Sequence, residues 1–269
     1  MYPTSAHRHR CGRYPASVLS GSIAALSIVG LVATIAGSLS MSAMGAEPMP
    51  GGWMLSNAWI RQYGRTPAAF ALIFLGHWLA MTTAMMLPSF APTLQRCHDM
   101  LTDTGVTRPG LPTLRIALGW FAAWMAAGML VFGSGIVLTG TALRDPALAR
   151  WFPFGVAAIV LAAGVLQSSA WKSRHLAGCR DASPRDRTLV AACPWRHGLH
   201  LGRHCVCACS GWMATLLVTD AMDLRAMALV AFAIAVERLA IEAKPVAEKT
   251  GAALVGVGFA LFVEAVAAQ

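Results

Sequence analysis

The sequence predicts an all-α protein, a polytopic bundle of about seven transmembrane helices. Of its 269 residues, 57% are hydrophobic and 12% are charged, which is about half the charged fraction of a typical soluble domain. The mean hydropathy is +0.58, and apolar stretches of roughly 20 residues, the length that crosses a bilayer, recur along the chain. This composition excludes a disordered chain, a secreted disulfide scaffold and an ordinary soluble enzyme.

The apolar stretches predict the individual helices. A basic tail over residues 1–16 precedes them, and no segment between them is polar and long enough to fold separately. Residues 17–268 are therefore expected to form a single transmembrane domain. The fifth helix is the least apolar because it opens with polar and Cys residues. The expected helices cover, in chain order, about 17–39, 68–87, 116–139, 151–170, 205–221, 224–243 and 251–268.

The first stretch has some features of a signal peptide. Arg8, Arg10 and Arg13 form a basic region before it, and Ala43-Met44-Gly45 resembles a cleavage site. However, its apolar run of about 22 residues exceeds the roughly 7–15 of a signal sequence. We therefore expect a retained helix; cleavage would leave six.

The net charge of +9 is explained by membrane topology. With a cytoplasmic N-terminus, 16 of the 21 Lys and Arg residues fall in cytoplasmic segments, as the positive-inside rule requires. The C-terminus is then periplasmic. The expected partner of this chain is the lipid bilayer, and its charge needs no nucleic acid.

Soft metal ligands gather on the predicted cytoplasmic side. Cys205, Cys207 and Cys209 lie within five residues. On a helix Cys205 and Cys209 share a face that Met213 continues, while Cys207 points elsewhere. The cytoplasm is reducing, so these thiols are expected to be free.

A second stripe of ligands lies on the second predicted helix. His77, Met81 and Met85 recur at four-residue steps, and a His at membrane depth usually faces an interior site or a polar partner. The second and fifth helices run antiparallel, so the two stripes would meet at matching depth if these helices pack. The nine candidate metal ligands are Cys205, Cys209, Met213, Met85, Met81, His77, Cys179, His175 and Cys207.

Thiolate and thioether ligands favour Cu(I), with Zn(II) as the lesser alternative. The competing interpretation is that small Cys residues only allow helices to pack closely. Three ionisable residues are also expected within the membrane: Glu237 and Arg238 in the sixth helix and Glu264 in the seventh. Each is expected to serve a function or to pair with a charge on another helix.

The ordered motifs of the chain resemble those of a bacterial family of predicted metal-binding integral membrane proteins, domain of unknown function 2182. The resemblance covers about 78–264. The residues that carry it are Ala84-Met85-Met86-Leu87-Pro88-Ser89 with Pro92, Ala163-Gly164-Val165-Leu166-Gln167 with Lys172, His175 to Arg180 with Pro184, Gly198, Gly202, Cys205, Cys209, Trp212, Met213, Met222-Asp223-Leu224 with Met227, and Glu237.

The resemblance implies metal binding in a bacterial inner membrane. This chain departs from the family's pattern at four positions. Ala208 and His175 stand where Cys is usual, Cys207 stands where Gly is usual, and Arg238 replaces Lys. The resemblance therefore implies a metal site whose affinity or stoichiometry differs from that of its relatives.

Together these features predict a multi-pass membrane protein that binds a soft metal ion, copper(I), for copper handling or for delivery to a copper-receiving protein. The alternatives are a small-solute transporter and a membrane scaffold subunit, in which Cys and Met serve only helix packing. We expect no enzyme activity, since the sequence has no nucleophile–base set, phosphate loop or haem-attachment motif. The sequence does not indicate an oligomeric state.

Overall fold

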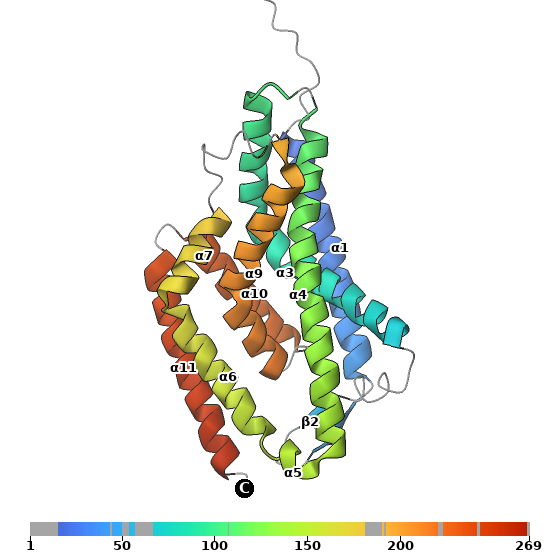
Figure 1. Cartoon of the computed structure of the whole chain (residues 1–269), viewed down its shortest axis with the longest axis vertical. Helices are drawn as coiled ribbons and strands as arrows, with labels where there is room; N and C mark the ends of the chain where they lie inside the picture. The colour runs from blue at the N-terminus through green and yellow to red at the C-terminus, as the bar shows by residue number, and fades with distance from the viewer. Residues whose placement is uncertain are drawn as a thin grey trace, which may run out of the picture.

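The structure is a computed structural model of the whole chain, and Figure 1 shows a bundle of mostly elongated helices. It describes residues 16–43, 45–49, 54–56, 67–106, 108–180, 190, 192–219, 223–240 and 243–267. Most of the basic tail predicted over residues 1–16 lies outside this set. The fold is all-α as predicted; the regular β structure among these residues is one short antiparallel pair, β1 (Ala46–Pro48) with β2 (Met54–Ser56).

Each of the seven predicted helices has a counterpart. The elements are α1 (Ala16–Ser42), α3 (Pro67–Asp103), α4 (Gly110–Arg144), α5 (Pro146–Ala149), α6 (Phe152–Gln167), α7 (Ala170–Arg180), α9 (Pro194–Thr219), α10 (Leu224–Leu239) and α11 (Ala243–Ala267).

Six segments of the described chain are long and apolar enough to cross a membrane, which is one fewer than predicted. The exception is α10, whose 16 residues extend only about 24 Å, against a hydrocarbon core of about 30 Å. The chain leaves the helical conformation at Ala240 (φ −59°, ψ 140°). Pro245 then lies in the first turn of α11, where its missing N–H breaks no helical hydrogen bond.

Two helices are longer than their apolar runs. We expected the second helix to end at Leu87, before Pro88, but α3 continues to Asp103 through both Pro88 and Pro92. A proline removes one backbone hydrogen bond and bends a helix, yet membrane helices tolerate it. The fifth helix begins at Pro194 rather than near Cys205, so its polar first half is helical too.

Glycines allow α4 and α9 to cross at very short range, side by side in Figure 1. A Cβ atom on Gly198 would lie 2.0 Å from the carbonyl oxygen of Ile116, and one on Gly119 would lie 2.4 Å from that of Trp195. Small residues at such crossings are typical of membrane helix pairs. The close crossing holds the Cys-bearing part of α9 against α4.

Aromatic side chains fill the space between α3 and α4. Phe90 stacks on Trp120 with ring centroids 4.6 Å apart, and the indole nitrogen of Trp78 donates to the carbonyl oxygen of Trp124 at 2.9 Å. All four side chains are buried, and Trp124 lies near Cys205 of α9.

Candidate metal centre

Two buried polar clusters meet at the end of α10. Glu237 and Arg238 are consecutive residues there, 2% and 5% exposed. Burying a charge is costly unless it is paired and hydrogen-bonded. Each of these two charged side chains therefore needs partners nearby, and those partners define the two clusters.

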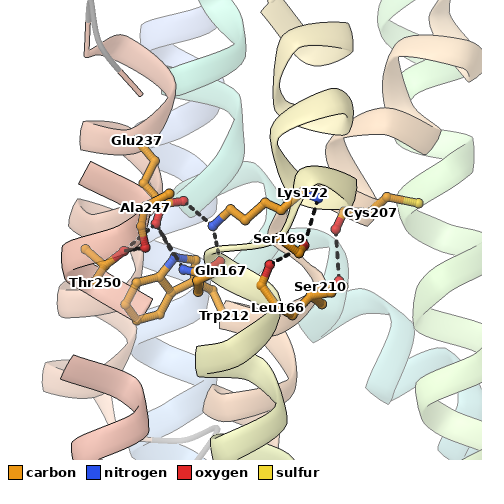
Figure 2. A network of polar contacts seen from close by, with 10 residues as sticks. All are labelled: Leu166, Gln167, Ser169, Lys172, Cys207, Ser210, Trp212, Glu237, Ala247 and Thr250. Atoms are coloured by element: carbon orange, nitrogen blue, oxygen red, sulfur yellow. Dashed lines mark hydrogen bonds and ion pairs between the residues drawn. The ribbon is translucent and has the colours of Figure 1, made fainter. Parts of the chain in front are cut away.

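Glu237 is the centre of the first cluster, which Figure 2 shows. Its carboxylate forms an ion pair with Lys172 of α7, with Nζ and Oε2 2.5 Å apart. It also accepts hydrogen bonds from Gln167 of α6 and Trp212 of α9, both 3.0 Å, and from Thr250 of α11 at 2.8 Å. Lys172 donates to Gln167 as well. Glu237 thus ties the end of α10 to four other helices.

Lys172 is 1% exposed. Burial lowers the pKa of its ammonium, and the Glu237 carboxylate acts in the opposite direction. A cavity lies beside this ion pair, lined by Ser169, Lys172, Leu176 and Lys244 among others. No Cys belongs to its lining, so this opening does not reach the thiols.

The second cluster consists of three thiols. Cys179 of α7 and Cys205 and Cys209 of α9 are 1%, 0% and 3% exposed. The thiol of Cys205 is the central one, since it interacts with the thiols of both Cys179 and Cys209. Burial raises the pKa of the Cys179 thiol well above its usual value. We call Cys179, Cys205 and Cys209 the thiol cluster.

Arg238 borders the thiol cluster. Its Nη1 donates to the sulfur of Cys205 at 3.2 Å and to Ser89 Oγ of α3 at 3.1 Å. The indole of Trp124 also approaches Cys205. Among the described residues no carboxylate forms an ion pair with Arg238. The Cys205 sulfur, once it has lost its proton, is therefore the group beside this guanidinium that could carry a negative charge.

The thiol cluster has the donor atoms of a soft-metal site, but its side chains are not yet arranged to coordinate an ion. Within the described part of the chain, no three His, Cys, Asp or Glu side chains stand ready to hold a metal together. Thiols joined by hydrogen bonds must first lose protons to become ligands. Thiolates in a water-excluded position suit Cu(I) and Zn(II) rather than Mg(II) or Ca(II).

The α3 and α9 stripes face each other across Arg238 rather than packing directly as predicted. The extensive contacts of α9 are with α4, α6 and α7, and those of α3 are with α1, α4 and α10. The guanidinium lies between Ser89 and Cys205. A charged side chain from a third helix therefore separates the two stripes at this level.

The register between the two stripes can still be read from two contacts. Cys97 Sγ of α3 lies 3.8 Å from His197 Nε2 of α9. Ser89 lies eight residues before Cys97 on α3, and Cys205 lies eight residues after His197 on α9; Arg238 donates to both. Steps of four residues keep one face of a helix. Continuing them places Met85 level with Cys209 and Met81 level with Met213, which are all buried.

His77 does not belong to this interface. Its ring lies against α1, since a Cβ atom on Gly37 would be 2.5 Å from His77 Nδ1. Two four-residue steps rotate a side chain by about 80°, which is enough to direct His77 to one neighbour and Met85 to another. Its Nε2 is buried without a hydrogen-bond partner among the described residues.

The remaining predicted residues lie apart from the thiols. His175 contacts His204 and not the thiol cluster; its pKa is lowered by burial and then by Arg203 and Arg174. Cys207 is half-buried, and Figure 2 shows its sulfur directed away from Glu237. Glu264 is exposed on α11, and no ion pair involves it within the described chain.

The sequence did not identify several members of the site. Lys172, Gln167 and Trp212 were noticed only within motifs, and Thr250 not at all, although all four contact Glu237. The available signal was a lysine just after an apolar helix, since a lysine that is drawn into a helix bundle needs a partner.

Comparison with known proteins gives one match. The model of a family described as PpoB2, copper chaperone, matches residues 75–261. These residues include every member of both clusters. No curated protein and no solved structure matches the chain. The match confirms a copper-related family, as the motifs indicated.

Proposed function

The chain belongs to the PpoB2 copper chaperone family, and we propose that it is a membrane protein that binds Cu(I) at the thiol cluster and hands it to a copper-receiving protein. Cys205 is the central ligand, with Cys209 and Cys179 beside it. Met85, Met81 and Met213 are further soft ligands at deeper levels. Copper is the cargo here, and no catalytic step is proposed.

The observation that carries this proposal is Arg238 beside Cys205 without a carboxylate partner among the described residues. Cu(I) held by two thiolates has a net charge of −1. The guanidinium cancels this charge, so the loaded site is neutral in a medium where a net charge is costly. Zn(II) reaches the same charge only with all three thiolates, and it then still takes a fourth ligand. Two thiolates suffice for Cu(I), so the cluster favours Cu(I) over Zn(II).

The protein's setting follows from the charge bias of its loops. We place it in a bacterial inner membrane with the N-terminus in the cytoplasm and the C-terminus in the periplasm. Figure 1 supports the opposite placement of the ends, since α1 begins at one end of the bundle and the C-terminus lies at the other. The ends of α3 and α9 that carry Cys97 and His197 then face the cytoplasm.

Metal analysis of the purified full-length protein tests this function. Wild-type protein reconstituted with Cu(I) is expected to hold copper against a moderate chelator, and Cys205→Ser/Cys209→Ser to lose it. Cys193→Ser is the matched control, because Cys193 is exposed and outside the cluster. If the double variant retains wild-type copper, the thiols serve only helix packing and the proposal is wrong.

A further inference from the structure

Three imidazoles form a continuous string where α7 crosses α9. His175 Nδ1 and His204 Nδ1 are 2.9 Å apart, and His204 Nε2 and His200 Nε2 are 3.2 Å apart. Trp171 packs edge-on against His175, with ring centroids 4.4 Å apart. His200 is exposed, and His175 and His204 are half-buried. All three rings therefore lie at or near the surface of the bundle.

The string adjoins the thiol cluster on the same two helices. His175 lies one turn before Cys179 on α7, and His204 directly precedes Cys205 on α9. The thiols are sealed from solvent and do not line the nearby cavity. An ion that reaches Cys205 must therefore first bind groups that a donor protein can touch. On α9, His200 and His204 are two such metal ligands that already contact each other.

We propose that His200 and His204 form an exposed transfer position for Cu(I), through which the ion passes between a soluble partner and Cys205. This inference rests on the proposed function. Cu(I) keeps its oxidation state throughout. As the Cys205 sulfur replaces an imidazole nitrogen on the ion, the released imidazole takes up the thiol proton and then loses it to solvent at the surface, which returns the imidazole to its neutral form.

The geometry of the two rings fits a shared ion. Imidazole nitrogens bind Zn(II) at about 2.0–2.1 Å, so two of them on one tetrahedral ion lie about 3.3 Å apart, and a Cu(I) ion with further ligands would need a similar spacing. The Nε2 atoms of His200 and His204 already lie 3.2 Å apart. His175 contacts the opposite ring nitrogen of His204, as the outer partner of a metal-binding His usually does.

The incomplete ligand set is consistent with transfer rather than storage. His204 uses opposite nitrogens toward its two partners, so the three rings do not converge on one ion. An ion held by two imidazoles keeps an open position for a ligand from the donor or acceptor. Arg203 and Arg174 lie close enough to His175 to affect it electrostatically, and their charges disfavour a divalent ion more than a monovalent one.

The test measures how fast Cu(I) enters the full-length protein in detergent from a coloured Cu(I)–bicinchoninate complex. His200→Ala is expected to slow loading about tenfold or more while the final copper content stays at the wild-type value. Arg196→Ala is the matched control, since Arg196 is exposed one turn away on α9, and it should load at the wild-type rate. A wild-type rate in His200→Ala would overturn the transfer position.

A second measurement does not depend on the thiols. In Cys179→Ser/Cys205→Ser/Cys209→Ser protein, X-ray absorption should show weakly held Cu(I) with nitrogen ligands, and adding His200→Ala should remove it. Absence of nitrogen-bound copper in the triple variant would also overturn the inference. A different result would show that the proposed function itself is wrong: the copper content of Cys205→Ser/Cys209→Ser protein would equal that of the wild type.

Discussion

Glu237 and Arg238 are adjacent in the chain, yet their side chains enter two different buried clusters. The Glu237 carboxylate pairs with Lys172 at 2.5 Å, while the Arg238 guanidinium lies 3.2 Å from the sulfur of Cys205. Consecutive residues of a helix are rotated by about 100°, so one short helix can serve both. This arrangement couples the position of α10 to the thiol cluster. It also separates the ion pair that stabilises the fold from the cluster that is proposed to hold the metal.

Replacing Arg238 should weaken copper binding more than it weakens the fold. Arg238→Gln removes the charge that balances a dithiolate Cu(I) complex but strands no opposite charge. Its Cu(I) affinity, measured by chelator competition, should fall about 10–100-fold, the range found for groups just outside a metal's ligands. Arg225→Gln, on the exposed face of the same helix, should bind like wild type. Equal affinities in the two variants would contradict the charge argument.

Replacing Glu237 should weaken the fold more than it weakens copper binding. Glu237→Gln leaves the Lys172 ammonium buried without its carboxylate, which costs about 3–5 kcal/mol of unfolding free energy. Lys172→Met/Glu237→Gln removes both charges and should recover part of that loss. The exposed pair Lys244–Glu248 is the control: Glu248→Gln should change stability by less than about 1 kcal/mol. Denaturant unfolding in detergent measures all three, and a Glu237→Gln protein as stable as Glu248→Gln would refute the pairing.

The register between α3 and α9 predicts a specific cross-link. With the other cysteines replaced by Ser, Met85→Cys should be joined to Cys209 by a short bismaleimide, because the two positions lie level. Met86→Cys is the control, since the next residue is rotated by about 100°. Mass spectrometry of the digested protein identifies the linked peptides. Linkage through Met86→Cys but not Met85→Cys would show that the register is shifted. Met85→Leu then shows, by its copper content, whether the thioether is a ligand or only fills space.

The α4–α9 crossing predicts opposite effects for two glycines. Gly198→Ala would place a methyl group 2.0 Å from the Ile116 carbonyl oxygen, so α9 must shift. Overpacking of this kind costs about 1–3 kcal/mol or more. Gly133 of α4 has nothing within 4 Å of its missing Cβ, and Gly133→Ala should stabilise by about 0.5–1 kcal/mol. Thermal unfolding of the two variants compares them directly; destabilisation of the same size in both would argue against a close crossing.

Reporter fusions test the orientation. A fusion after Ala170 should report the cytoplasm and one at Gln269 the periplasm, since 16 of the 21 basic residues lie on the proposed cytoplasmic side. An N-terminal sequence of the mature protein beginning near Gly45 would show instead that the first helix is a cleaved signal. If both fusions report the opposite compartment, the thiol cluster lies toward the periplasm and a cytoplasmic partner is excluded.

The sequence was sufficient for the helices and for the chemical character of the site. Apolar stretches of bilayer length identify a membrane bundle without knowledge of any contact, because the hydrocarbon core imposes that length on each helix. The four-residue spacing of Cys205, Cys209 and Met213 assigned them to one face, and they are all buried as that face requires. Helix ends were less predictable, as the continuation of α3 past Pro88 and the short length of α10 show.

Which groups meet was decided only by the tertiary structure. Periodicity states which residues of one helix share a face, but it carries no information about the helix opposite. His77 therefore faces Gly37 of α1 although it belongs to the same stripe as Met85. Cys179 joins the thiols while His175, one turn away, joins His200 and His204. The sequence by itself determined a membrane bundle with thiol and thioether side chains on defined helix faces, since composition and spacing are local properties. The pairing of Arg238 with Cys205 depends on how three helices pack, which is a property of the whole bundle.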